Sequence, residues 1–427
     1  MNRRKILFHK KQRLRIPIWD WGREHDAGAL SQAVNITKLP FARHHVSLMA
    51  DRHQGYGMPI GGVAAFDNVI MPNAVGVDIG CSMTAVRTSL KGMLADRIKQ
   101  IFSNVREMIP IGKNHHKTPQ YWDGFEDAPD IPIIQDNLSS ARKQLGTLGG
   151  GNHFIEIQQA NDGHIWFMIH SGSRNIGYRV AEFYHKAAIE QCNKWHIKLP
   201  HKDLAYLPAA SDMGKEYIEA MQYMLKFSRE SHRQMARSVS QAFNLAFGHH
   251  IHLLNTIYVK HNYAALENHY GLNLWVHRKG AIRMRRGDVG IIPGDQGRKS
   301  YIVEGKENKF QRIAFYSAPH GAGRIMGREQ AKRELNLADE VKFLEDQGIV
   351  HTLRNQQNLD EASGSYKNIK NVVNAHNRQM KRLVVLTPLG AIKDPSSRKK
   401  RYGKKSVKPE LANRKRVVHI DDISPLY

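Results

Sequence analysis

The chain has 427 residues, 41% of them hydrophobic, which is enough to bury a substantial core. Its 64 lysines and arginines outnumber 39 aspartates and glutamates, so the formal net charge of +25 should attract a polyanion such as a nucleic acid. The sequence has no signal peptide and no long apolar stretch, which argues against a membrane protein. With only two cysteines, Cys81 and Cys192, we expect a reduced, cytoplasmic protein without a disulfide framework.

Hydrophobic periodicity predicts a mixture of helices and short strands without regular βαβ repetition, and therefore an α+β fold. Short strands with tight turns are expected over residues 40–90, 154–157, 165–169 and 272–303. Helices are expected over residues 91–108, 177–194, 213–247, 327–347 and 365–382. We expect residues 1–393 to form a single composite catalytic domain.

Residues 394–427 differ in composition, with ten lysines and arginines against four aspartates and glutamates. Such a segment cannot bury enough apolar surface to fold alone. This basic C-terminal extension is therefore either a solvated tail or an RNA-binding arm whose contribution falls with salt.

A carboxylate and a thiol stand three residues apart in the run Val75–Cys81. Asp78 offers a hard oxygen and Cys81 a soft sulfur, and the intervening glycine lets both turn toward one point. This pairing is unusual for a core strand and suits a metal. It matches neither a zinc ribbon nor a magnesium carboxylate cage.

Three histidines in separate segments are further candidate ligands: His153, His170 and His261. A single histidine at a strand end is more often a hydrogen-bonded core residue, so the interpretation depends on all three occurring with Asp78 and Cys81. A bridging thiolate could hold two metals close together, as in phosphoryl transfer. Ligand softness leaves zinc, iron and manganese open.

His320 follows a proline and precedes the turn Gly321-Ala322-Gly323. Glycines there let backbone N–H groups approach a phosphate, whose oxygens Arg324 could pair with. A neutral imidazole keeps a lone pair and can attack a nucleoside triphosphate, forming a phosphoramidate. The alternative is a histidine that starts a helix in a glycine turn. Together these residues suggest a metal-dependent nucleotidyl-transfer enzyme acting on RNA.

Two other patterns have simpler explanations. The stripe of Met221, Met224 and Met235 at helical spacing predicts core packing. The histidine-rich run His249–His252 lacks acidic or cysteine companions and predicts a solvated loop. No GxxxxGK[ST] sequence is present, which argues against a P-loop enzyme.

From about residue 40 to Lys393 the chain resembles the RtcB family of RNA ligases. The resemblance rests on a series of motifs in the family's order: Asp51–Gly57, Val75–Cys81, Leu145–Glu156, His170–Gly177, His261–Tyr263, Arg278–Ala281, Gly290–Gly294, His320–Arg324 and Asp360–Ala362.

The resemblance implies the family's α+β fold and a GTP- and Mn(II)-dependent ligase with two manganese ions. Such enzymes join RNA with a 3′-phosphate or 2′,3′-cyclic phosphate to RNA with a 5′-hydroxyl, through a guanylylated histidine and an RNA–ppG end. His320 would be guanylylated. The implied manganese ligands are Asp78, Cys81, His153, His170 and His261. The implied nucleotide and phosphate contacts are Asn152, Glu156, Arg174, Asp295, Ser300, Gly321, Gly323, Tyr366 and Lys393.

The chain also departs from the family's pattern. Asp295 replaces the serine after Pro-Gly and brings a negative charge near the expected nucleotide, and Ser231-His232 replaces an Asn-Arg pair. These changes suggest a divergent paralogue with a narrower substrate, in RNA repair. Two other functions are open: an RNA 2′,3′-cyclic phosphoesterase that needs the metal ligands but not His320, and a non-catalytic RNA-binding protein.

Overall fold

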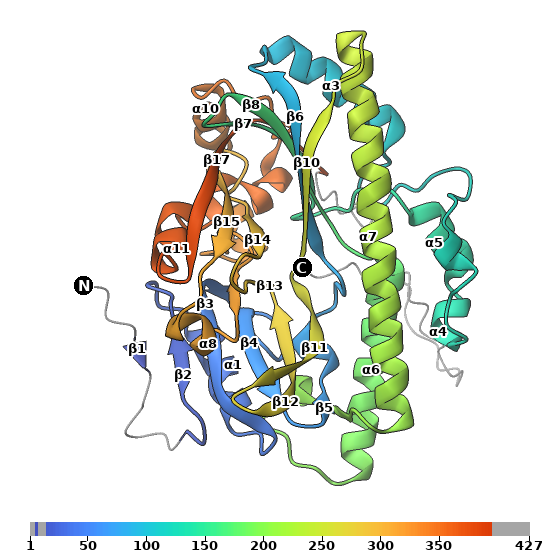
Figure 1. Ribbon diagram of the computed structural model, residues 1–427, viewed down its shortest axis with the longest axis vertical. Coiled ribbons are helices and arrows are strands. Elements are labelled where there is room, and N and C mark those ends of the chain that lie inside the picture. The colour runs from blue at the N-terminus through green and yellow to red at the C-terminus, as the bar shows by residue number, and fades with distance from the viewer. Residues whose placement is uncertain (1–4, 7–13, 395–427) are drawn as a thin grey trace, which may run out of the picture.

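Two β-sheets form the centre of the computed structural model, which describes residues 5–6 and 14–394 (Figure 1). In order across the six-stranded sheet lie β1 (Lys5–Ile6), β2 (Ile18–Asp20), β3 (Ala42–His53), β4 (Ile60–Phe66), β12 (Leu272–Lys279) and β11 (Asn262–His269). The seven-stranded sheet has the order β10 (Leu253–Lys260), β6 (Ser82–Lys91), β8 (His164–Ser171), β7 (Phe154–Ala160), β17 (Met380–Lys393), β15 (Ser300–Gly305) and β14 (Val289–Ile292). Two short pairs join β13 (Ala281–Arg283) to β16 (Ser317–Pro319) and β5 (Val69–Ile70) to β9 (Leu207–Pro208).

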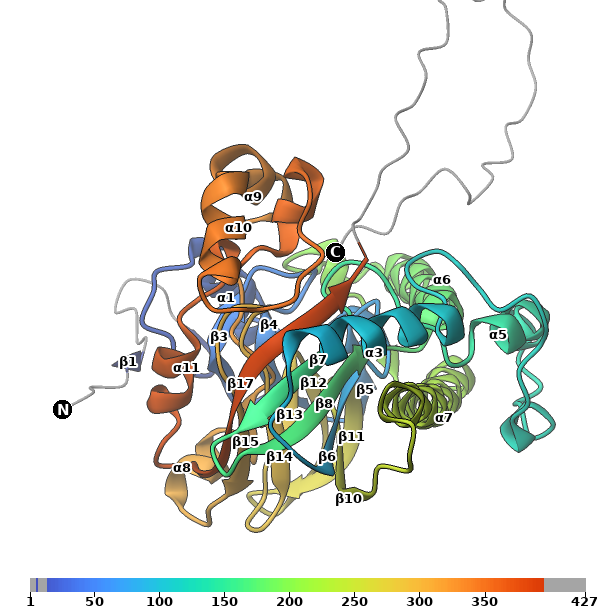
Figure 2. The ribbon, with the colours of Figure 1, turned by 90° about the horizontal axis from the view of Figure 1, so that it is seen from above.

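Helices cover the outer faces of both sheets. The longer ones are α1 (Ala27–Thr37), α3 (Ala95–Met108), α6 (Arg174–Lys194), α7 (Asp212–Phe247) and α10 (Leu337–Glu345). The shorter ones are α2 (Pro72–Val75), α4 (Pro132–Gln135), α5 (Leu138–Gln144), α8 (Lys309–Ile313), α9 (Arg328–Glu334) and α11 (Ile369–Ala375). Single 3-10 turns occur at Asp123–Phe125, Lys202–Leu204, Gln356–Glu361 and Ser363–Ser365. Figure 2 shows α9 and α10 together on one side of the molecule, away from α7.

The hydrophobic cores follow these layers. Between the sheets, Val63 and Val276 of one pack with Met168 and Ile302 of the other. The outer face of the seven-stranded sheet is covered by α3 and α7, and the outer face of the six-stranded sheet by α1. The central strands β4, β7 and β8 are therefore buried on both faces, which fixes their register and the positions of the residues at their ends.

The α+β fold expected from the sequence is confirmed. The 36-residue α7 is one unbroken helix, with Ser211 capping its start and Gly248 in a left-handed conformation at its end. The methionine stripe faces the core, since Met221, Met224 and Met235 are at most 1% exposed. His249, His250 and His252 are exposed, as predicted for a solvated loop.

The helix expected over residues 365–382 is largely wrong. Only Ile369–Ala375 is helical, and β17 begins at Met380. Within that range, Met380, Lys381 and Arg382 pair with β15, because cross-strand pairing outweighs a weak helical pattern. Among the described residues, no helix combines the length and apolar character needed to cross a bilayer. Residues 395–427 of the predicted basic extension lie outside the described part.

The two sheets meet where several motif residues lie. His261 is the single residue between β10 of the seven-stranded sheet and β11 of the six-stranded sheet. Its backbone N–H donates to the carbonyl of Cys81, which directly precedes β6. His170 lies near the end of β8, antiparallel to β6, and is paired with Met83. The junction of the sheets therefore gathers residues that are far apart in the sequence.

Candidate active site

A buried cluster of thiol, imidazole and carboxylate groups lies at this junction. The ligand atoms of Cys81, His153 and His170 all lie within 4.8 Å of one another. Cys81 Sγ is 3.2 Å from His170 Nε2 and 3.5 Å from His153 Nε2. Asp78 joins them, since its Oδ2 is 3.1 Å from His153 Nε2. Two imidazole nitrogens and a sulfur thus face a common point, as the donors of a transition-metal site do, and the Asp78 carboxylate lies at its edge beside His153.

His170 of this cluster, and His261 with its ring centroid 5.2 Å from that of His170, are in the form that binds metals. Burial, together with neighbouring histidines, holds the pKa values of His170 and His261 well below the usual range, so both are neutral at physiological pH. His170 Nδ1 lies 3.0 Å from the carbonyl oxygen of Asn152 and therefore carries the proton, which leaves Nε2 free as a ligand. The residues present thus fit a cation.

Cys81 is the group that a cation would change most. Burial and the nearby Asp78 carboxylate raise the pKa of its thiol well above the ordinary value. The protein alone therefore favours the protonated thiol. A bound metal ion reverses this preference, because a coordinating thiol is deprotonated.

His320 lies next to this cluster and is held by Asp51. The centroids of the His320 and His261 rings are 4.8 Å apart. Asp51 Oδ2 accepts hydrogen bonds from His320 Nδ1 at 2.7 Å and from the His320 backbone N–H at 3.0 Å. The hydrogen bond from His320 contributes to lowering the pKa of the fully buried Asp51 against the effect of burial, so the carboxylate is ionised and can only accept. Nδ1 of His320 therefore carries a proton, and in the neutral imidazole the lone pair is on Nε2.

The second glycine after His320, Gly323, is required by the close approach of this loop to β3. Gly323 has φ of +73°, and a Cβ there would lie 1.9 Å from the Asp51 carbonyl oxygen. The backbone N–H of Gly321 donates to Asp51 Oδ2 at 3.3 Å. The glycine turn thus fixes His320 against Asp51, a role that the sequence analysis did not assign.

A second group of motif residues surrounds Glu156 on β7. Gln158 Nε2 donates to Glu156 Oε1 at 2.8 Å and to Ser300 Oγ at 2.9 Å, which joins β7 to β15. Ser300 Oγ also accepts from the backbone N–H of Gly294 at 3.1 Å. Burial raises the pKa of Glu156 to about 8. Glu156 is therefore largely protonated at neutral pH.

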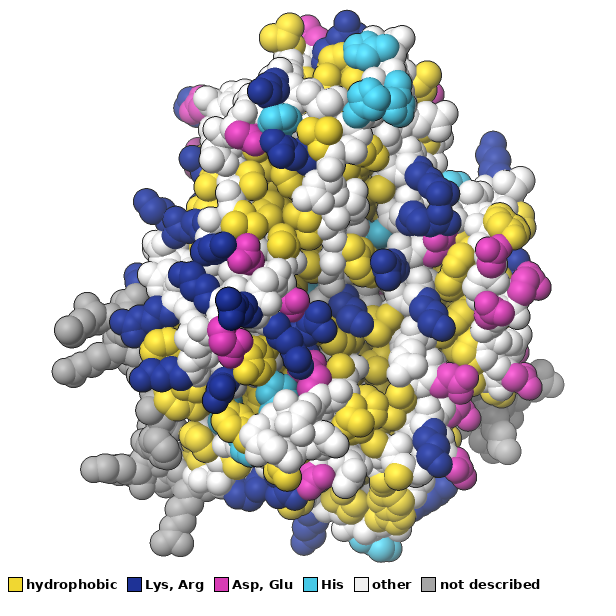
Figure 3. Space-filling model, in the orientation of Figure 1, with side chains coloured by type: hydrophobic (Ala, Val, Ile, Leu, Met, Phe, Trp, Pro, Cys, Tyr) yellow, Lys and Arg dark blue, Asp and Glu magenta, His cyan; other side chains and the backbone are white. Residues whose placement is uncertain are grey.

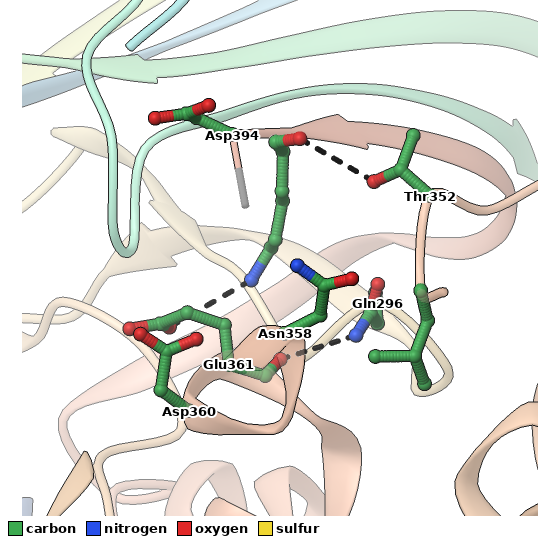
Figure 4. A pocket seen from close by; sticks show the side chains of 8 residues that line it. Gln296, Thr352, Asn358, Asp360, Glu361 and Asp394 are labelled. Carbon is green, nitrogen blue, oxygen red and sulfur yellow. Dashed lines mark hydrogen bonds and ion pairs between the residues drawn. The ribbon is translucent and has the colours of Figure 1, made fainter. Parts of the chain in front are cut away.

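Tyr366 and Lys393 lie together around a third buried carboxylate, Glu361. The Tyr366 hydroxyl donates to Glu361, Arg328 Nε donates to it at 2.9 Å, and Lys393 Nζ lies 3.9 Å from it. Burial opposes ionisation of Glu361, but Arg328, Arg324 and Lys393 lower its pKa to about 2. Figure 4 shows Asp360, Glu361 and Asp394 around an adjoining cavity of about 10 Å³. This cavity has room for one water molecule but not for a purine.

Comparison with known proteins identifies the family of the chain. The family model described as "tRNA-splicing ligase RtcB" matches residues 32–394. The chain belongs to the RtcB family.

Curated relatives match over most of their own length. The RNA-splicing ligase RtcB of Escherichia coli K12 is 30% identical, covering 88% of this chain and 97% of the relative. The tRNA-splicing ligases RtcB of Archaeoglobus fulgidus and Pyrobaculum aerophilum are 31% and 30% identical, covering 86% and 85% of this chain and 91% and 90% of the relatives.

The departures from the RtcB pattern are accommodated by local partners. Asp295 is buried, and its oxygens accept from Ser363 Oγ at 2.5 Å, the Gly297 N–H at 3.0 Å and Arg298 Nη1 at 2.9 Å. Its charge is thus balanced within the loop. Ser231 Oγ accepts from the Gly146 N–H at 3.1 Å.

His232, the second residue of the Ser231-His232 departure, contacts strands next to Cys81, His153 and His170, the candidate metal-ligand cluster. Its Nδ1 lies 2.9 Å from Thr84 Oγ1, and its Nε2 lies 3.1 Å from the carbonyl oxygen of Ser171, the neighbour of His170. His232 is 1% exposed and Ser231 is 0% exposed, so neither reaches a phosphate at the surface.

The remaining predicted contacts of the RtcB pattern differ in how they are held. Arg174 lies beside His153, since a Cβ on Gly149 would lie 2.5 Å from Arg174 Nη1 and 2.0 Å from His153 Nδ1. Its guanidinium donates to Thr147 Oγ1 at 3.0 Å and to the Gly112 carbonyl at 2.8 Å.

Arg324, predicted to pair with a phosphate, instead donates to Glu361 at 3.3 Å and to the Asp360 and Met326 carbonyls.

Proposed function

We propose that this protein is a GTP- and Mn(II)-dependent RNA ligase that joins a 3′-phosphate or 2′,3′-cyclic phosphate end to a 5′-hydroxyl end. The observation that carries the proposal is the cluster of Cys81, His153 and His170 beside a histidine whose reactive nitrogen is free. A phosphoesterase needs the cluster alone. The orientation of His320 by Asp51 has a purpose only if His320 itself reacts.

Asp78, Cys81, His153, His170 and His261 would hold the two manganese ions. Bound there, they would supply positive charge to the phosphate oxygens at each transfer. A thiolate, a carboxylate and neutral imidazoles form a mixed donor set that suits manganese as well as softer metals.

His320 would act as the nucleophile toward GTP. Its Nε2 attacks the α-phosphorus, a P–N bond forms, and the bond to pyrophosphate breaks. Asp51 stabilises the imidazolium that develops, because its ionised carboxylate holds the Nδ1 proton. Backbone N–H groups around Gly321 and Gly323 would lie near the nucleotide phosphates.

RNA would then take the guanylyl group from His320. A 2′,3′-cyclic phosphate is first opened by water to a 3′-phosphate. An oxygen of the 3′-phosphate attacks the guanylyl phosphorus, the P–N bond breaks, and RNA–ppG forms. The 5′-hydroxyl of the second RNA next attacks the 3′-phosphorus and expels GMP. Arg174 and Asn152, beside the metal-ligand cluster, would position the RNA phosphate.

Glu156, Ser300, Tyr366 and Lys393 would contact the guanosine. Guanine presents N–H donors that suit a carboxylate, and Lys393 and Tyr366 are already neighbours, with the ammonium 5.7 Å from the ring centroid. The cavity beside Lys393 is too small for a purine, so Lys393 and the other side chains that line it would have to move for guanine to enter there. Because Cys81 is required as a thiolate, we also propose a reducing, cytoplasmic setting.

The test is an end-joining assay with manganese and GTP on RNA fragments bearing defined ends. Joined product from 3′-phosphate and 5′-hydroxyl ends, dependent on GTP, is the expected result. A matched 3′-hydroxyl substrate should give none. Opening of a cyclic phosphate without joining, at saturating GTP, would refute the ligase proposal and indicate the phosphoesterase.

A further inference from the structure

A groove of about 910 Å³ runs between α7 and β10, and no step proposed above uses it. One wall is formed by Lys226, Arg229, Arg233 and Arg237 of α7, and the other includes Tyr258 of β10. In Figure 1 these two elements run side by side along the front of the molecule. In the same orientation, Figure 3 shows basic side chains along the α7 side and hydrophobic side chains beside them.

The four cations form a stripe along one face of α7. Spacings of three and four residues place their side chains one above another on a helix. All four are exposed, and the stripe from Lys226 to Arg237 is about 16 Å long at 1.5 Å per residue. That length matches a few nucleotides of an extended strand.

Most of this charge is not balanced by the protein. Arg233 is paired with Glu230, to which it donates twice, at 2.5 and 2.6 Å. Within the described residues, no carboxylate lies within ion-pair distance of Lys226, Arg229 or Arg237. Asp123 and Asp127 line the groove at the Trp122 loop, on a different element from the stripe. The α7 wall therefore offers three unpaired cations to an external anion.

Aromatic side chains line the groove together with these cations. The Arg229 guanidinium lies 5.9 Å from the centroid of the Tyr258 ring. Trp122, at the groove's edge, stacks on Tyr223 with the ring centroids 5.6 Å apart. Unpaired cations together with aromatic rings are the combination by which proteins hold single-stranded nucleic acids, through the phosphates and the bases respectively.

The floor of the groove is connected to the metal-ligand cluster. Thr84 and His232 line it, and His232 reaches the carbonyl oxygen of Ser171, next to His170. The groove is thus a basic track on the same strands that position the candidate active site.

We propose that the α7–β10 groove binds a single-stranded segment of the RNA substrate, away from the ends that react. This inference rests on the proposed RNA ligase function for the identity of the ligand. Lys226, Arg229 and Arg237 contact phosphates, and Tyr258 and Trp122 contact bases. The groove would thereby contribute affinity for longer RNAs without taking part in the chemistry.

The test compares the full chain with the triple variant K226A/R229A/R237A. The control variant K194A/K198A/K215A removes the same charge from exposed lysines near the end of α6 and the start of α7. Affinity for a single-stranded RNA of about 30 nucleotides is measured by fluorescence anisotropy across a salt titration. Guanylylation by GTP in the absence of RNA is measured in parallel and reports an intact fold.

The groove variant should bind RNA at least about tenfold more weakly than the control, with a salt slope lower by about 2, since each lost phosphate contact removes about 0.7. Guanylylation should be unchanged. Equal affinity and slope in the groove variant and the native protein would overturn the proposal, as would a native protein that does not bind RNA at low salt. If the groove variant weakens RNA binding but the native protein joins no ends, the groove stands and the ligase proposal fails.

Discussion

Around Cys81, burial keeps the thiol and the imidazoles of His170 and His261 neutral beside a single carboxylate, Asp78, whereas around Glu361 the buried charges are already paired. His170 and His261 have pKa values well below the usual range, and the pKa of Cys81 lies well above it. Glu361, with a pKa of about 2, is surrounded by Arg324, Arg328 and Lys393.

The difference bears on how each region tolerates change. A cluster in which neutral donors converge beside one carboxylate gains free energy when a cation binds, so loss of one donor should be severe. A region whose charged groups are already hydrogen-bonded and paired can accommodate a further charge if a neighbouring residue pairs with it. The Asp295 carboxylate is an example, because Arg298 and Ser363 donate to it. Substitutions at the metal-ligand cluster should therefore have larger effects than those near Asp295.

The largest effect is expected for Cys81→Ala. Removing the thiolate should lower manganese affinity by at least 10- to 100-fold and abolish both guanylylation and joining. Equilibrium dialysis with manganese measures the first effect. Cys192→Ala is the control, because that thiol is also buried but lies in the separate core beneath α6. Undiminished manganese binding by Cys81→Ala would remove the contrast between the two regions.

Asp51→Asn should slow guanylylation by roughly 10²–10⁴-fold. The amide can offer an N–H to His320 Nδ1, which favours the tautomer with the proton on Nε2, where the lone pair is needed. Single-turnover labelling by GTP measures the rate, and circular dichroism confirms that the variant is folded. A native rate in this variant would show that Asp51 does not set the tautomer of His320.

Glu156 should make GTP binding depend on pH. The guanine N–H donors need an ionised acceptor, and burial raises the pKa of Glu156 to about 8, so affinity should rise up to about tenfold per pH unit as pH increases toward 8. Glu156→Gln should show a flat profile by equilibrium binding. The same shift should lower the stability of the native protein as pH rises from 4.5 to 8, because the unfolded chain loses this proton first. GTP-binding profiles that change with pH in the same way in the native protein and in Glu156→Gln would contradict the assignment of Glu156 as the guanine contact.

The smallest effect is expected for Asp295→Ser, which restores the residue usual in the family. The carboxylate is bound by Arg298, Ser363 and the Gly297 N–H, which balance its charge, so the KM for GTP should change less than about threefold. Stability should fall by about 1–3 kcal/mol, because Arg298 loses a charge-assisted partner. A tenfold gain in GTP affinity would show instead that the Asp295 charge repels the nucleotide.

The sequence predicted five ligands, namely Asp78, Cys81, His153, His170 and His261, because these residues stand in short motifs at the ends of elements. The donor atoms of Cys81, His153 and His170 converge, Asp78 contacts His153, and the His261 ring lies 5.2 Å from that of His170. It did not reveal Asp51 as the partner of His320, since the two are 269 residues apart and meet only where β3 passes the glycine turn. The paired environment of Glu361 was not predicted for the same reason. The cations around Glu361 are Arg324, which precedes α9, Arg328 of α9 and Lys393 at the end of β17. The helix expected over 365–382 failed because pairing with β15 is invisible to a local pattern.

The most direct test of the account is covalent labelling. Native protein and His320→Ala are incubated with manganese and GTP labelled at the α-phosphate, and the products are separated on a denaturing gel. The account predicts an acid-labile labelled band in the native protein that is absent from the variant. The absence of label from folded, manganese-loaded native protein, or equal label in the variant, would contradict the assignment of His320 as the guanylylated residue.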